Sequence, residues 1–169
     1  MVQAAAIAGA SRIFVIDTNS QKFEKARELG ATDFVNPREL SVPVQQHLVE
    51  QTKWGVDVCL EATGDVDVMR AAIESAHRGW GQTVLAGVAA AGKEVSTRPF
   101  QFITGRKLTG TAFGGWKSRA EVPQLMQRVV DGELDVSKYV THRFDGVEGT
   151  LDALKAMETG DCIRAVVKY

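Results

Sequence analysis

The sequence lacks the features that mark membrane proteins and nucleic-acid-binding proteins. Its 20 basic and 21 acidic side chains nearly cancel, and no segment concentrates charge of one sign. The longest apolar runs, such as residues 83–91, are too short to cross a bilayer, and no basic start followed by a long apolar run opens the chain. We therefore expect no nucleic-acid partner and no membrane partner. The composition is compatible with a small-molecule partner or with no partner.

Cysteine and histidine are also scarce. Cys59 and Cys162 are far apart and form no C-x-x-C pair, which fits a reducing, cytoplasmic compartment and offers no metal framework. His47, His77 and His142 are too dispersed to predict a metal site. We therefore expect no metal ligands in this chain and assign none of its residues to catalysis.

Short apolar, β-branched runs alternate with helix-like segments, the pattern of βα units wound into a parallel sheet. The predicted fold class is α/β, and 169 residues suffice for one sizeable core. A long connection without a helix is expected at 89–105. Strands are predicted at 13–17, 33–36, 57–62, 82–88, 107–113, 139–144 and 163–167. Helices are predicted at 2–9, 19–29, 42–52, 66–77, 120–130 and 147–158.

Residue types at the helix ends give more local expectations. Thr18 or Asn19 is predicted to cap the 19–29 helix, and Gly30 to end it in the left-handed conformation. Ser41 is predicted to cap the 42–52 helix, with Pro43 in its first turn.

The beginning of the chain differs from a complete dinucleotide-binding domain. Residues 2–9 have an alanine-rich helical pattern with neither a strand nor a cap before it. A doubly wound domain opens with a strand and a G-x-G-x-x-G turn, and its ribose-binding acid follows about 20 residues later. No such motif occurs here, and Asp17 is at the right distance only if the glycines lay before Met1. The sequence therefore predicts an incomplete Rossmann sheet without its first strand and glycine turn.

Three long segments resemble the C-terminal half of the medium-chain zinc alcohol dehydrogenases. Within that family, they are most similar to class III, the S-(hydroxymethyl)glutathione dehydrogenases. They are ASRIFVIDTNSQKFEKARELGAT, RPFQFITGRKLTGTAFGGWKS and CIRAVVKY, and the similarity is collinear over 2–169. It implies an NAD-binding Rossmann domain over 1–113, then a C-terminal segment, 114–169, that in the family returns to the catalytic domain. It also implies a homodimer through the strand near 109–113, and places the zinc ligands in an N-terminal half.

The resemblance implies NAD-dependent oxidation of S-(hydroxymethyl)glutathione and primary alcohols, with hydride transfer to the nicotinamide and zinc acting as a Lewis acid. Because this chain has no zinc ligands, the isolated chain is expected to be inactive. The alternative is a noncatalytic, truncated fragment that binds NAD weakly or binds a partner. Loss of the glycine turn would remove donors from the cofactor pyrophosphate.

The adenosine end of the cofactor is assigned by the resemblance to two strand ends. Asp17 would bind both hydroxyls of the adenosine ribose and repel a 2'-phosphate, which favours NAD over NADP, and Lys22 would contact the ribose. Ala62 and Thr63 would lie beside the adenosine. By local pattern alone, Asp17 is a helix cap, Lys22 a solvated lysine, and the other two an ordinary strand-to-helix turn.

The nicotinamide end is assigned in the same way to the next two strand ends. One segment would contact the nicotinamide ring through its backbone, and the other would bind the carboxamide through its main chain. Val88 and Ala112 would border the substrate, and the small Ala112 would leave room for a bulky thiol adduct. The alternatives are a plain core strand and an edge or interface strand. The two segments are Ala86, Gly87 and Val88, and Thr111, Ala112 and Phe113.

Two arginines complete the predicted site. Arg164 resembles the arginine that reaches the cofactor pyrophosphate, where a guanidinium fork suits two phosphate oxygens. Arg78 stands where class III enzymes often have a lysine thought to meet a carboxylate of the glutathione adduct. Without the resemblance, Arg164 is a surface arginine and Arg78 a cation at a helix C-terminus.

Overall fold

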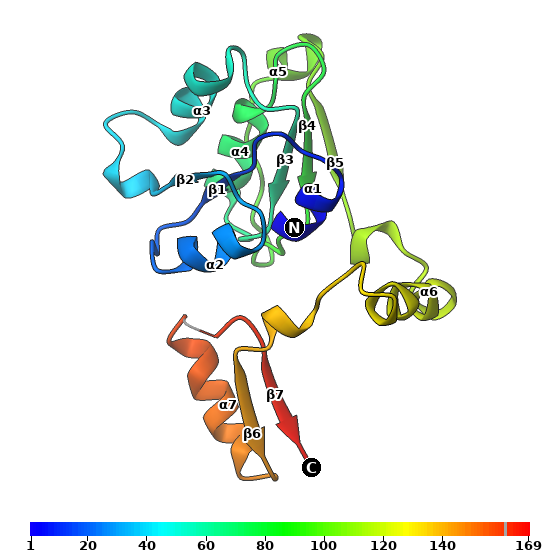
Figure 1. Cartoon of the computed structure of the whole chain (residues 1–169). Helices are drawn as coiled ribbons and strands as arrows, with labels where there is room; N and C mark the ends of the chain where they lie inside the picture. Colours follow the sequence, from blue (N-terminus) through cyan, green and yellow to red (C-terminus); the bar gives the residue numbers. More distant parts are fainter. Residues whose placement is uncertain (161) are drawn as a thin grey trace. The chain divides into compact units, whose positions relative to one another are not determined.

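The computed structural model describes residues 1–160 and 162–169. The chain divides into two compact units, Met1–Gly115 and Trp116–Tyr169 (Figure 1). The strands of the first unit are β1 (Phe14–Ile16), β2 (Asp33–Val35), β3 (Val58–Glu61), β4 (Gln82–Leu85) and β5 (Lys107–Gly110). Its helices are α1 (Val2–Ile7), α2 (Lys22–Glu28), α3 (Val44–Thr52), α4 (Val66–Ser75) and α5 (Phe100–Ile103), with short 3₁₀ turns at Pro37–Glu39 and Phe113–Gly115.

All strand pairs of the first unit are parallel, but they form two separate sheets. β1 pairs with β2, and β3, β4 and β5 lie side by side in that order (Figure 1). Among the described residues, no ladder joins the two sheets. A doubly wound sheet has the strand order 3-2-1-4-5-6, so removing its first strand leaves a pair and a triplet. The observed topology confirms the predicted incomplete Rossmann sheet and leaves β1 and β3 each with a free edge.

A small apolar core lies beneath the β1–β2 sheet. Ile13, Ala26 and Ala31 are buried together. Their partly buried neighbours include Val15 and Phe34 from the sheet, and Val2, Ala5 and Ala6 from α1. The predicted helix at the start of the chain therefore forms, and one of its faces is held by this core.

Helix α4 covers one face of the second sheet. Asp65 caps it, because its Oδ1 accepts hydrogen bonds from the amide nitrogens of Asp67 and Val68. Met69 and Ile73 are buried at 4% and 1% exposure. The hydroxyl of Thr83 in β4 donates to the carbonyl of Ala72, 3.2 Å away, so a polar residue inside the strand is satisfied by the helix that covers it.

Three local expectations are wrong. Neither Thr18 nor Asn19 caps α2, because the Asn19 side chain accepts from the amide of Gln21 in a turn before the helix starts. Ser41 does not cap α3, whose N-cap position is occupied by Pro43. The 89–105 connection contains α5, which Pro99 precedes with helix-compatible angles. Gly30, with φ of 104°, confirms the predicted end of α2.

The second unit is a single βαβ motif preceded by a helix. Its elements are α6 (Ser118–Val130), a 3₁₀ turn at Ser137–Tyr139, β6 (His142–Asp145), α7 (Gly149–Glu158) and β7 (Ala165–Lys168). β6 and β7 pair in parallel, and α7 packs against both, burying Ala153 (Figure 1). Gly149 allows this close packing, since a Cβ there would lie 2.8 Å from Cβ of Phe144.

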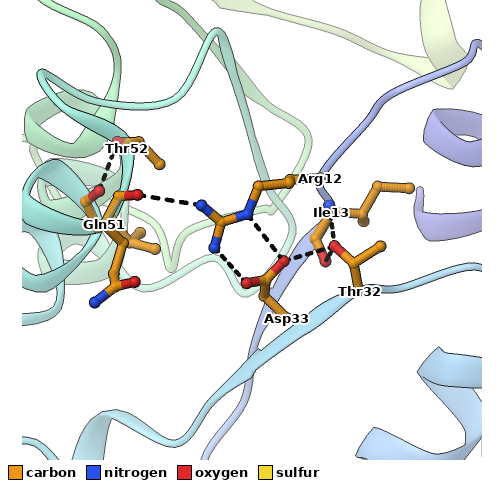
Figure 2. Close-up of polar contacts among 7 residues, drawn as sticks. Arg12, Ile13, Thr32, Asp33, Gln51 and Thr52 are labelled. Atoms are coloured by element: carbon orange, nitrogen blue, oxygen red, sulfur yellow. Dashed lines mark hydrogen bonds and ion pairs between the residues drawn. The ribbon is translucent and has the colours of Figure 1, made fainter.

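An ion pair at the amino ends of β1 and β2 ties the first sheet to α3 (Figure 2). The Arg12 guanidinium donates to both oxygens of Asp33, at 2.5 and 3.3 Å, and to the carbonyl of Gln51, at 3.1 Å. Thr32 adds a third bond to the same carboxylate. The hydrogen bond from Arg12 is the main reason why the pKa of Asp33 is lowered from its usual value.

The Asp33 pair predicts a pH-dependent stability. Because the native pKa is lowered, the contribution of the carboxylate is complete above the unfolded pKa of about 4 and is lost as the pH falls through the native pKa. We expect Asp33→Asn to lower the urea midpoint at pH 7, and the difference from the natural chain to shrink below about pH 4. Glu24→Gln, which alters an exposed pair with Arg27, is the control and should change little. A pH-independent difference for Asp33→Asn would contradict this account.

Candidate cofactor site

The carboxyl ends of β3, β4 and β5 meet at one edge of their sheet because the three strands are parallel and in register. The amides of Ala86 and Gly87 both donate to the carbonyl of Glu61, at 2.9 and 3.1 Å. The amide of Thr111 donates to the carbonyl of Leu85 at 3.0 Å. The structure therefore brings together three of the predicted segments, 62–63, 86–88 and 111–113. Open α/β sheets bind their ligands at this edge.

Glycine is required where the first two of these segments touch. A Cβ on Gly87 would lie 2.3 Å from the amide nitrogen of Gly64 and 2.6 Å from Oε2 of Glu61. A Cβ on Gly64, whose φ is 80°, would lie 2.3 Å from the carbonyl oxygen of Val88. The two strand ends thus approach as closely as bare backbones allow. Beyond this contact, Val88 is 91% exposed and presents an apolar side chain to whatever binds at the edge.

The turn after β5 has an unusual backbone. Phe113 and Gly114 have positive φ values of 53° and 68°, and the amide of Gly115 donates to the carbonyl of Ala112. Phe113 is 60% exposed. A non-glycine residue in the left-handed region is uncommon, and such backbones concentrate at binding sites.

Asp17 directly follows β1, on the other sheet. Its Oδ2 lies 3.2 Å from Nζ of Lys22, and its Oδ1 accepts from the amide of Asn19. The two predicted ribose residues are therefore neighbours. Both side chains remain partly exposed, at 28% and 48%, so the carboxylate is held in place without being closed off from a ligand.

Arg78 lies apart from these strand ends, and Arg164 belongs to the other unit. Arg78 precedes β4, so it is at the opposite, amino edge of the sheet, in an open depression of about 700 Å³ with Trp54, His77, Trp80 and Thr104. Fully extended, at about 3.3 Å per residue, the segment from Gly81 to Val88 would span at most roughly 23 Å. Arg164 belongs to the second unit, is exposed, and its carbonyl accepts from the amides of residues 141 and 142.

Sequence reasoning missed Glu61, the last residue of β3. It is 3% exposed, and its Oε1 accepts from the amide and hydroxyl of Thr63 and from the amide of Gly64. The available signal was a carboxylate that ends an apolar strand directly before an Ala-Thr-Gly turn. A buried polar group of this kind needs hydrogen bonds that replace its contacts with water.

Cys59 is a buried thiol in this structure. Burial raises the pKa of the Cys59 thiol to about 12, so the thiolate that metals and electrophiles require is not formed at neutral pH. Within the described part of the chain, no group of three or more His, Cys, Asp or Glu side chains is placed to hold a metal ion.

Among the same residues, no helix is long and apolar enough to cross a membrane.

The fold and the glycine contact at the strand ends define an incomplete Rossmann-like domain. The chain belongs to the zinc-binding dehydrogenase family, whose sequence model matches residues 1–131. It is 52% identical over all 169 residues to S-(hydroxymethyl)glutathione dehydrogenase of Photobacterium damsela subsp. piscicida, and 50% identical to the Synechocystis enzyme of that name. In both cases the chain covers 46% of the relative's length. It therefore spans about half of these relatives and corresponds to their C-terminal part, as predicted.

Solved structures show the same fold. Benzyl alcohol dehydrogenase from Acinetobacter calcoaceticus matches with a TM-score of 0.88 at 21% identity, over 99% of this chain and 45% of that one. The 2R,3R-butanediol dehydrogenase from Bacillus subtilis matches with a TM-score of 0.84 at 26% identity, over 99% and 46%. A putative zinc-binding dehydrogenase from Sinorhizobium meliloti 1021, bound to NADP, matches with a TM-score of 0.86 at 22% identity, over 99% and 48%.

The glycine contact predicts a steep cost for one added methyl group. We expect Gly87→Ala to lower the free energy of unfolding by about 1–3 kcal/mol, because the backbone of Gly64 cannot move away without breaking the turn after β3. The measurement is urea unfolding. The control is Gly110→Ala in β5, whose Cβ would lie 3.8 Å from the nearest heavy atom and which should be neutral. Equal effects of the two substitutions would show that the contact is not tight.

Proposed function

We propose that this chain is the C-terminal part of an NAD-dependent oxidoreductase that oxidises S-(hydroxymethyl)glutathione and primary alcohols. The 52% identity to a dehydrogenase of that name supports the substrate class. The observation that carries the proposal is the convergence of three strand ends around Gly87, where the lack of a side chain lets the end of β4 pack directly against the turn at Gly64. The chain contributes cofactor contacts, and the zinc ligands belong to the rest of the enzyme.

Asp17 sets the cofactor as NAD in this proposal. Its carboxylate follows β1 with Lys22 beside it, and it would accept hydrogen bonds from both ribose hydroxyls. A 2'-phosphate would be repelled, and the next residues, Thr18 and Asn19, offer no guanidinium to bind one. The NADP-bound neighbour is only 22% identical, so it supports the fold alone. The preference for NAD is inferred from Asp17 and the residues that follow it.

Further cofactor contacts are proposed at the carboxyl ends of β3, β4 and β5. Ala62 and Thr63 would lie beside the adenosine. The segments 86–88 and 111–113 would hold the nicotinamide ring and its carboxamide, which are needed for the bound NAD to accept a hydride. Arg164 is the proposed pyrophosphate contact from the second unit. The division of roles at about residue 113, with a cofactor domain before it and a catalytic-domain segment after it, belongs to the same proposal.

Substrate contacts are proposed at the exposed Val88 and Ala112, which follow neighbouring strands. Arg78 was expected to meet a carboxylate of the glutathione adduct. Because it lies at the opposite edge of the sheet, it does not share a site with Val88 within one chain. Its contact with the adduct therefore remains a prediction that rests on the resemblance alone.

We also propose a cytoplasmic homodimer. All four residues of β5 are exposed, and among the described strands β5 pairs only with β4. An open strand edge of this kind pairs readily with another copy. Two free cysteines, Cys59 and Cys162, support a reducing compartment. The small-molecule substrate and the second copy are the only partners in this proposal, which includes neither a nucleic acid nor a membrane.

The zinc of the family does not fit this chain, because the described residues offer no ligand cluster for it. We therefore expect the isolated chain to bind NAD weakly and to show no turnover with formaldehyde and glutathione. Joining it to the N-terminal part of the Photobacterium relative should restore zinc content and turnover. Zinc-dependent turnover by the 169-residue chain alone would contradict the fragment assignment. A folded, zinc-loaded chimera without turnover would contradict the proposed reaction and favour a noncatalytic fragment.

The ribose role of Asp17 is tested separately in that chimera. We expect Asp17→Ser to reduce the preference for NAD over NADP by about tenfold or more, roughly 1.4 kcal/mol, because the charge that repels the 2'-phosphate is removed. The measurement is the ratio of kcat/KM values for the two cofactors. Glu24→Ser, an exposed carboxylate on α2, is the control. An unchanged ratio for Asp17→Ser would exclude the ribose contact.

A further inference from the structure

Glu61 carries a buried carboxyl group at the edge where the cofactor is proposed to bind. Only 3% of it is exposed, yet it belongs to neither an ion pair nor a metal cluster among the described residues. A carboxylate without water needs donors of its own. Glu61 obtains them from the turn that follows its own strand.

One oxygen of Glu61 holds that turn. Its Oε1 lies 2.5 Å from both the amide nitrogen and the hydroxyl of Thr63, and 3.2 Å from the amide nitrogen of Gly64. Thr63 in turn accepts from the amide of Asp65, the cap of α4. The side chain therefore fixes the whole course of the chain from β3 into α4.

The main-chain carbonyl and Oε2 of Glu61 lie toward the end of β4. Its main-chain carbonyl accepts from the amides of Ala86 and Gly87. Its Oε2 is buried without a hydrogen-bond partner, and a Cβ on Gly87 would lie 2.6 Å from it. The carboxylate thus fills the space that a side chain at position 87 would otherwise need, and it lies between the two turns.

We propose that Glu61 is a positioning residue that sets the separation between the 62–64 turn and the strand end at Gly87–Val88. This inference rests on the proposed function, in which the turn faces the adenosine and the strand end faces the nicotinamide. A dinucleotide that contacts both needs that separation, whereas a mononucleotide such as AMP would contact the turn and Asp17 but not the strand end at Gly87–Val88. Glu61 therefore contributes to NAD affinity beyond its contribution to AMP affinity.

The test compares the two ligands in the 169-residue chain by calorimetric titration. We expect Glu61→Ala to weaken NAD binding at least tenfold more than AMP binding. Glu61→Gln keeps an accepting oxygen and should restore the ratio to within about threefold of the natural chain. The control is Asp65→Ala, which removes the α4 cap and lowers stability without touching Gly87, so both affinities should fall together. A ratio unchanged by Glu61→Ala would overturn the proposal.

Amide hydrogen exchange tests the positioning role of Glu61 without nucleotide binding. It uses Glu61→Asp, a smaller change that serves if Glu61→Ala does not fold. Glu61→Asp shortens the side chain by one methylene and withdraws the oxygen from Thr63 and Gly64. Amide hydrogen exchange at Gly64 and Gly87 should then become at least tenfold faster than in Asp65→Ala. Protection equal to that of the control would overturn the positioning role. If the natural chain binds neither nucleotide, the same titrations are made in the chimera. A folded chimera that binds neither nucleotide would contradict the proposed cofactor site, and the exchange rates would then decide the role of Glu61.

Discussion

Parallel pairing of β3, β4 and β5 is the constraint on which the candidate site depends. The register sets Glu61 opposite Leu85 and Leu85 opposite Gly110, so the three strands end at the same level. Because parallel strands point the same way, the residues that follow all three emerge at one edge. Residues about 25 positions apart in sequence, such as Glu61 and Leu85, thereby become neighbours. The close contact of Gly64 with Val88 is possible only because this register holds the two backbones together.

The division of the sheet explains the unusual exposure of apolar residues in the first unit. In β3, Val58 and Leu60 are 56% and 44% exposed, while Cys59 and Glu61 on the other face are buried. Ile16 at the end of β1 is 37% exposed. Free strand edges and uncovered apolar faces are expected where a doubly wound sheet is incomplete, because the missing strand and its covering elements would bury them. The 46% coverage of the relatives agrees with this physical picture.

Much of the fold could be predicted because its signals are local. Each of the first five predicted strands overlaps an observed one, and Gly30 ends α2 as its left-handed angle requires. Helix starts were less predictable, because a proline or a competing turn replaced the expected caps of α2 and α3. The short α5 has too few residues to show a periodic pattern. For the site, segments 62–63, 86–88 and 111–113 were placed at strand ends from the sequence, and the structure brings them together.

The sequence by itself determined the α/β class, the missing first strand and the strand ends that form the candidate edge, since these follow from periodicity, from glycine positions and from a long family resemblance. Only the tertiary structure decided which residues share that edge. It separated Arg78 from Val88, because the two lie at opposite ends of β4. It also showed Glu61 buried between two turns. The donors to its side chain are local, in the turn at Thr63 and Gly64, but its approach to Gly87 depends on the pairing of β3 with β4, which no local sequence pattern indicates.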